Sequence, residues 1–271
     1  MSFATWQELY QSDLQGAVAV TVVPLLFLLY LAWTEHTGPT GVLPSAARFV
    51  RAWAGTFAVL TLVDPLAGGP LMRLLGLADA PATTVVMVTF VLLGDFRVYL
   101  LVFTLLAYAG ARHDSRAADP VFAARDALQL VPTRAAVAAG LVTLVVPLVA
   151  VGVDAALRAR KPDLPSQTIW LVYELTFLVV ALVLRAWVVP ARVPVAEPRL
   201  RSYLRAILAY VAVYYALWAT ADGIILAGLD VGWALRMLPN QLYYAFWVPV
   251  VWWLFFSPRY AAASTSVQTR R

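Results

Sequence analysis

Ionisable and polar side chains interrupt several of the longest apolar runs of this sequence. Because a charged group at the centre of a membrane span costs about 2.5–3.5 kcal/mol on insertion scales, such a residue usually marks an ion or solute pathway, a proton relay or a specific ion pair. Acidic groups in such a pathway bind protons or cations, and a single arginine can act as their counter-charge. The candidate binding residues are Asp64, Asp95, Arg97, Glu174, Asp222, Asn240 and Gln241.

Aromatic side chains accompany these polar residues at helical spacing. Residues three, four or seven apart lie on one face of a helix, so Asp95 shares a face with Tyr99, and Glu174 shares one with Trp170. The same spacing joins Asp222 to two aromatic residues before it and Asn240 to two after it. The sequence therefore predicts a polar cavity with aromatic walls, and its candidate lining residues are Tyr99, Trp170, Tyr215, Trp218, Tyr244 and Trp247.

Arg97 needs a partner on another helix. Asp95 is only two residues away, roughly 200° around the helix, so the two side chains cannot pair directly. We expect Arg97 to pair with Glu174 or with Asp64. An alternative interpretation is that these charged groups form one buried ion-pair network that only fixes the packing of the helices.

The composition of the chain indicates that these polar residues belong to a membrane protein. Of 271 residues, 62% are hydrophobic and only 13% are charged, whereas a soluble domain carries about 25% charged residues. A span of the hydrocarbon core needs about 20 apolar residues. We predict an all-α, polytopic membrane protein with seven transmembrane helices, at residues 17–33, 52–69, 83–108, 135–156, 168–189, 206–228 and 241–257.

The distribution of basic residues predicts the orientation. If the N-terminus is outside, most arginines between the segments fall on the inner side, as the positive-inside rule requires; Arg158 to Lys161 is the exception. We therefore expect a multi-pass protein of the cell membrane with its N-terminus outside and its C-terminus in the cytoplasm. Residues 1–257 form one transmembrane domain, and 258–271 form a flexible cytoplasmic tail. The N-terminal region lacks the basic residues of a cleavable signal peptide.

The fourth segment differs from the others because residues 135–153 contain no ionisable group. It is typical of a linker helix between two groups of three helices. The second and sixth segments, which would correspond in such a repeat, both begin Arg-Ala and both carry a late aspartate, Asp64 and Asp222. The pattern favours a parallel 3+1+3 repeat.

Seven helices in this pattern, with the N-terminus outside, resemble the transporter/opsin group: sugar transporters of the SWEET type, PQ-loop proteins and microbial rhodopsins. Pro239-Asn240-Gln241 is similar to the proline-containing helix breaks of the transporters. A rhodopsin needs a Schiff-base lysine in its seventh helix, and the only lysine is Lys161 in a loop, so covalent retinal is excluded. A non-covalent carotenoid or other apolar ligand beside Trp218 and Trp247 stays open.

The residues needed for disulfides and for common metal sites are absent from the sequence or too few. Without cysteine and with only two histidines, the chain offers no disulfide, no thiolate site and no histidine-rich metal site, and we expect no metal and no cofactor. The net charge of +5 comes from residues at helix ends, which favours contact with lipid headgroups over nucleic-acid binding.

We expect a small transporter or permease with an outward-facing acidic cavity that takes a small molecule or a proton. An alternative is an intramembrane enzyme that acts on a lipid or isoprenoid, with two carboxyl groups as acid and base. Membrane lysoplasmalogenases resemble the chain in being small polytopic proteins with buried acids. A receptor or non-catalytic partner subunit is a further alternative, and the oligomeric state stays undefined.

Overall fold

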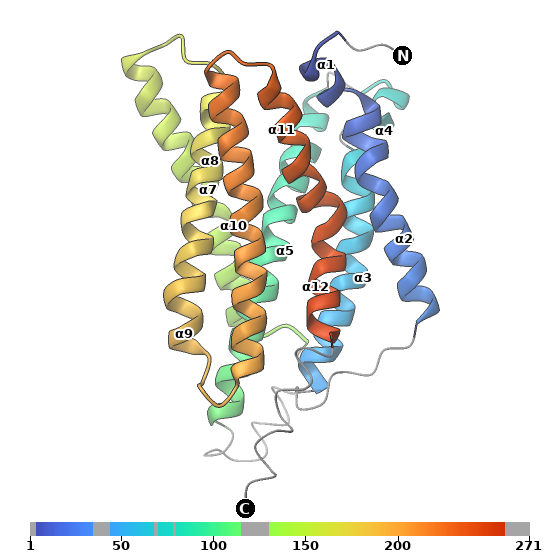
Figure 1. Cartoon of the computed structure of the whole chain (residues 1–271), viewed down its shortest axis with the longest axis vertical. Helices are drawn as coiled ribbons and strands as arrows, with labels where there is room; N and C mark the ends of the chain where they lie inside the picture. The colour runs from blue at the N-terminus through green and yellow to red at the C-terminus, as the bar shows by residue number, and fades with distance from the viewer. Residues whose placement is uncertain (1–3, 35–43, 68–69, 78–79, 115–129, 258–271) are drawn as a thin grey trace, which may run out of the picture.

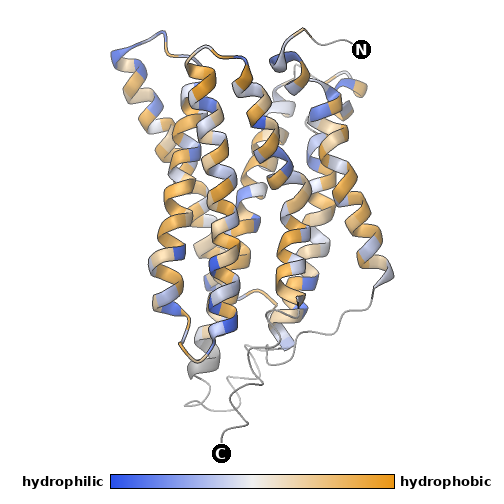
Figure 2. Cartoon of the chain, viewed as in Figure 1, coloured by the Kyte–Doolittle hydropathy of each residue, from blue (hydrophilic) through white to orange (hydrophobic). Residues whose placement is uncertain are grey.

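The fold is a bundle of long apolar helices in a computed structural model of the chain (Figure 1). The structure describes residues 4–34, 44–67, 70–77, 80–114 and 130–257. Every regular element among them is helical. Six helical segments have the length and composition to cross a membrane: Leu14–Trp33, Pro44–Ala67, Pro81–Gly110, Thr133–Arg160, Gln167–Arg192 and Pro198–Leu226. Orange, apolar residues predominate along them, and blue, hydrophilic residues occur at both ends of the bundle and at a few points within it (Figure 2).

The helices carry the labels of Figure 1. The six long segments are η1 (Leu14–Val18) with α2 (Ala19–Trp33), α3 (Pro44–Ala67), α5 (Pro81–Asp114), α7 (Thr133–Arg160), α8 (Gln167–Val183) with η2 (Leu184–Val188) and α9 (Val189–Arg192), and α10 (Pro198–Leu226). The chain then continues through α11 (Val231–Asn240), η3 (Gln241–Phe246) and α12 (Trp247–Phe256). Two further helices are short: α1 (Trp6–Tyr10) and α4 (Pro70–Leu74). Here η marks a π-helical stretch, in which the hydrogen bonds run from i to i+5.

The first six predicted spans coincide with the six long helices, which confirms the all-α class and the presence of several helices long and apolar enough to cross a membrane. Several helices are longer than predicted. The sixth begins at Pro198 rather than at residue 206, because polar and basic residues occupy its first two turns. The predicted 3+1+3 repeat stays a prediction. The expected cytoplasmic tail, residues 258–271, lies outside the described residues.

The last part of the chain is a broken helix. Pro239 lies in α11 and Pro249 in α12, and neither can donate the backbone hydrogen bond of a regular helix. Between them the π-helical turn η3 places Tyr243 and Tyr244. Figure 1 shows α11, η3 and α12 following one another along the length of the bundle.

Neighbouring helices in the sequence are also neighbours in the bundle. In chain order, α2 packs on α3, α3 on α5, α5 on α7, α7 on α8 and α8 on α10. The broken last segment completes the ring, because α11 packs on α10, η3 packs on α2 and α12 packs on α3. Apolar side chains such as Leu141 and Leu148 of α7 are exposed on the outside of this ring, as lipid contact requires.

The bundle has two distinct ends. We call the end that holds α1, α4 and α11 the α1 end, and the opposite one, which holds α9 and the start of α10, the α9 end (Figure 1). The side chain of Asp230 accepts hydrogen bonds from the backbone N–H groups of Trp6 and Gln7, at 2.8 and 3.2 Å. A carboxylate at a helix N-terminus satisfies groups that have no partner within the helix. Asp230 therefore joins α1 to the start of α11.

This arrangement predicts which loops share a side of the membrane. The protein has no cysteine, so a single introduced cysteine can be labelled without interference. Ser166→Cys and Leu229→Cys, at the α1 end, should both react with a membrane-impermeant maleimide in the same preparation, either intact cells or inside-out vesicles. Ala196→Cys, between α9 and α10, should react only in the other preparation. Labelling of all three from the same side would contradict the arrangement.

Candidate functional site

The α1 end of the bundle contains a cavity of about 400 Å³. Its walls come from α1, α5, α8, α10, α11 and η3, which are far apart in the sequence. The lining residues are Tyr10, Met87, Val91, Asp95, Gln167, Trp170, Tyr173, Glu174, Tyr215, Trp218, Trp233, Arg236, Asn240, Tyr243 and Tyr244. Pockets of about 300–1,000 Å³ with a few convergent polar groups are typical of small-molecule sites.

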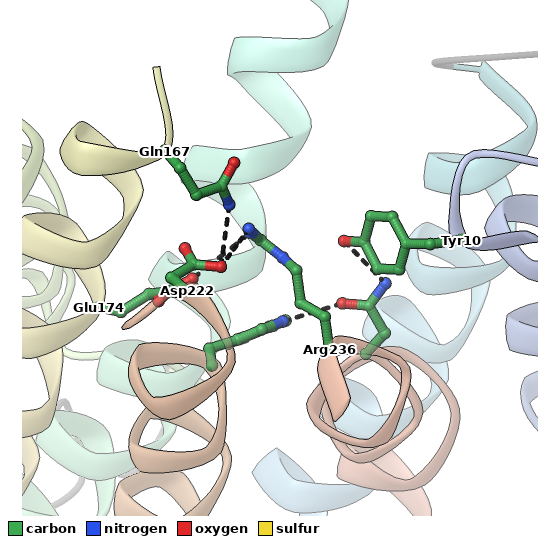
Figure 3. Close-up of polar contacts among 7 residues, drawn as sticks. Tyr10, Gln167, Glu174, Asp222 and Arg236 are labelled. Atoms are coloured by element: carbon green, nitrogen blue, oxygen red, sulfur yellow. Dashed lines mark hydrogen bonds and ion pairs between the residues drawn. The ribbon is translucent and has the colours of Figure 1, made fainter. Parts of the chain in front are cut away.

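Two of these lining residues, Glu174 and Arg236, form a buried polar group with Asp222, which is fully buried behind the cavity wall. Arg236 of α11 lies 2.5 Å from Oδ1 of Asp222 on α10 and 3.4 Å from Oε1 of Glu174 on α8. Figure 3 shows its guanidinium extending from α11 across to both acids. Gln167 completes the group, because its Nε2 donates to the same Asp222 oxygen at 2.9 Å. We call Glu174, Asp222 and Arg236 the carboxyl–arginine triad.

The triad is buried, with Glu174 3% and Asp222 0% exposed. One oxygen of each carboxyl group, Oε2 of Glu174 and Oδ2 of Asp222, is buried without a hydrogen-bond partner among the described residues. Buried polar atoms without partners cost about 1–3 kcal/mol each. The two carboxyl groups also interact with each other, so a proton held between them can satisfy one of these oxygens.

Close packing of two helices makes the triad possible. Gly232 lies one turn before Arg236, and a Cβ atom built on it would lie 2.8 Å from the backbone oxygen of Ala221 and 2.9 Å from the backbone nitrogen of Ile225. Only glycine permits this approach of α11 to α10. The approach places Arg236 within reach of Asp222, the residue that follows Ala221.

Arg236 falls outside the seven predicted segments, since the seventh was expected to begin at residue 241. It is 9% exposed and belongs to a helix that begins ten residues before the predicted seventh segment. This helix was not predicted because residues 231–240 form no long apolar run and include Pro239. A usable signal was present, since Gly232, Arg236 and Asn240 recur at intervals of four and so share one helix face.

A second polar group surrounds Asp95. The hydroxyl of Tyr215 donates to Oδ1 of Asp95 at 2.5 Å, and that of Tyr173 donates to Oδ2. Two hydroxyl donors from α8 and α10 thus satisfy a carboxyl group on α5. Neither tyrosine hydrogen bond was foreseen, and Tyr173 was not a candidate residue.

Asn240 connects the cavity to the N-terminal helix. Its side-chain oxygen accepts a hydrogen bond from Nε1 of Trp218 at 2.9 Å, and its Nδ2 contacts the hydroxyl of Tyr10 at 3.3 Å. The ring of Tyr10 packs on Trp233, with 5.2 Å between centroids, and lies 5.7 Å from the Arg236 guanidinium carbon. The short helix α1 thereby forms part of the cavity wall.

Arg97 does not form the expected ion pair. Among the described residues it contacts neither Glu174 nor Asp64 as a salt bridge; its guanidinium donates to the hydroxyl of Thr61 and to the carbonyl of Tyr243, both at 2.6 Å. It also lies 4.4 Å from the centre of the Tyr243 ring. Two neutral oxygens and an aromatic face take the place of an acid. Asp64 and Arg97 line a separate small crevice, not the cavity.

The other candidate residues divide between the cavity and the core. Trp170, Tyr215, Trp218, Asn240 and Tyr244 line the cavity together with Asp95 and Glu174. Tyr99 and Trp247 are buried in the core instead, Tyr99 against Phe177 with 5.7 Å between ring centroids. Gln241 is half-buried and outside the lining set.

Among the described residues, no group of three or more His, Asp and Glu side chains gathers as a metal site. Comparison of the chain with family models, with curated proteins and with solved structures found no match. The function therefore has to be argued from this site.

The close approach at Gly232 generates a stability prediction. Gly232→Ala should push α11 away from α10, lengthen the Arg236–Asp222 contact and destabilise the protein by roughly 1–3 kcal/mol. Gly223→Ala is the matched control, because a Cβ there would meet nothing within 4 Å. Thermal unfolding in detergent should show a lower midpoint for Gly232→Ala and an unchanged or higher one for Gly223→Ala. Equal midpoints for the two variants would contradict the packing described.

Proposed function

We propose that the protein is a membrane permease that exchanges a small organic cation for a proton at the cavity of the α1 end. The observation that carries this proposal is the carboxyl–arginine triad, in which two buried carboxyl groups share one guanidinium. The first six spans and the broken α11–η3–α12 segment together make seven crossings. We place the N-terminus and the cavity outside the cell and the C-terminus in the cytoplasm.

The charge of the triad supports proton exchange. Arg236 neutralises one carboxylate, and a second ionised carboxylate in a buried site carries a large desolvation penalty. One of the two acids therefore holds a proton when the cavity is empty. A bound cation can replace that proton, so one positive charge enters as one leaves. Glu174 is placed for this exchange, because it lines the cavity and interacts with both Arg236 and the second carboxyl group, Asp222.

The aromatic walls favour an organic cation. Trp170, Trp218, Trp233 and Tyr244 present rings to the cavity around the acids. Cations bind the faces of such rings, with about 2 kcal/mol or more at desolvated sites. A compact, strongly hydrated metal ion gains little from these rings, whereas a quaternary or alkylated ammonium group gains from both the rings and the carboxylates.

The backbone of the last segment supports a transport role. Broken helices at membrane depth are tolerated where they line cavities, and transporters use them at their binding sites. Here η3 lies between two proline-containing helices and contributes Tyr243 and Tyr244 to the cavity. The resemblance to the seven-helix transporters is consistent with this proposal.

Flux measurements test the proposal directly. Purified protein is reconstituted into vesicles that contain a pH-sensitive dye, and a panel of quaternary ammonium salts from tetramethylammonium to choline is added outside. These cations carry no dissociable proton and cannot shift the internal pH by diffusing as a free base. We expect at least one of them to make the vesicle interior more alkaline, because cation entry is coupled to proton exit.

Glu174→Gln and Asp222→Asn should each reduce this exchange by roughly tenfold or more, since each removes a charged partner worth about 1.5–3 kcal/mol. Asp163→Asn, at an exposed acid of the same end, is the matched control and should retain full exchange. Exchange that persists in both triad variants, or that no cation of the panel produces, would contradict the proposal.

A further inference from the structure

A second pocket lies at the α9 end, far from the cavity described above. It has a volume of about 440 Å³ and lies between η2 and the first turns of α10. Its lining residues are Arg185, Val195, Pro198, Arg201, Ser202, Arg205, Ala206 and Ala209. Three of these eight side chains are arginines, and the set contains no carboxylate.

The backbone holds the three arginines together. Arg201 and Arg205 are one turn apart on α10, and Nε of Arg185 donates to the backbone carbonyl of Arg205 at 3.3 Å. A nitrogen of Arg201 donates to the carbonyl of Pro190, also at 3.3 Å. Like charges at this spacing repel one another, so the cluster gains from an anion between the guanidinium groups. Their planar N–H groups match the oxygens of a phosphate.

The surroundings of the pocket are those of a membrane surface. Arg185 belongs to the apolar segment Gln167–Arg192, and the arginines of α10 belong to the first two turns of another span. Val195 is 81% exposed, and Trp187, two residues after Arg185, is 68% exposed. Exposed aromatic rings of this kind lie at the headgroup level of a bilayer, and long arginine side chains extend toward the same level.

We infer that the Arg185–Arg201–Arg205 pocket is a binding site for the phosphate of an anionic phospholipid in the leaflet at the α9 end. The guanidinium groups bind the phosphate, and the exposed side chain of Val195, which lines the pocket, contacts the upper acyl chains. Basic pockets between transmembrane helices bind anionic headgroups in this way. The inference is independent of the proposed transport, because none of these residues lines the cavity.

Native mass spectrometry of the full-length protein in a neutral detergent tests this inference. Phosphatidylglycerol and phosphatidylcholine are titrated separately, and the bound lipid is counted at each concentration. We expect one tightly retained phosphatidylglycerol and at least roughly tenfold weaker retention of phosphatidylcholine. Inorganic phosphate in large excess should not displace the bound phosphatidylglycerol, because it lacks acyl chains. Displacement by inorganic phosphate at the same concentration as the lipid would identify a free-phosphate site and overturn the lipid assignment.

Variants locate the site. The double variant Arg185→Gln/Arg205→Gln should weaken phosphatidylglycerol retention by roughly tenfold or more. The charge-conserving Arg185→Lys/Arg205→Lys should retain most of it. Arg192→Gln, an exposed arginine of α9 outside the pocket, is the matched control and should leave retention unchanged. Thermal unfolding without lipid checks that the glutamine variant is folded. Wild-type retention in a folded glutamine variant, or an equal loss in Arg192→Gln, contradicts the inference.

Discussion

Arg236 is the residue on which the polar half of the structure depends. Its guanidinium joins α11 to α10 through Asp222 and to α8 through Glu174, so three helices meet at one buried cation. Removal of one partner of such a group would leave the others buried and unpaired, which costs about 3–5 kcal/mol. Two acids with one base also leave one negative charge unmatched. The same contact thus stabilises the packing and creates the excess charge that a proton or a cation must satisfy.

Other features of the α1 end follow from the position of α11. Gly232 allows α11 to contact the backbone of α10, and this contact sets the depth of Arg236. Asp230, at the start of the same helix, holds α1 by its N-terminal backbone groups, and this contact brings Tyr10 against the Arg236 side of the cavity. A similar close approach occurs on α5, where a Cβ on Gly94 would overlap the hydroxyl of Tyr243. Tyr243 therefore separates the cavity from the crevice of Asp64 and Arg97.

The six long helices could be predicted from the sequence because hydrophobic length is a local property and each segment reaches about 20 apolar residues. The faces that carry Trp170 with Glu174, and Trp218 with Tyr215, could also be predicted, since spacing determines which residues share a helix face.

Contacts that depend on the rotation and neighbours of each helix could not be predicted. Trp247 was expected on the face of Asn240 and Tyr244, but the π-helical turn η3 intervenes and Trp247 is fully buried in the core. The partners of Arg97 are a hydroxyl and a backbone carbonyl, which charge patterns do not reveal. Arg236 was missed because its helix is short, polar and interrupted by Pro239, so no apolar run marks it.

The most direct test of this account is the protonation of the carboxyl–arginine triad. Difference infrared spectra of the reconstituted protein, recorded with and without a quaternary ammonium ion that the vesicle assay identifies as transported, report the carbonyl stretch of protonated carboxyl groups. The account predicts that the cation removes one such band and that the change is absent in Glu174→Gln or Asp222→Asn but present in Asp163→Asn. A wild-type spectrum without this loss, or a loss that persists in both Glu174→Gln and Asp222→Asn, would contradict proton–cation exchange at the triad.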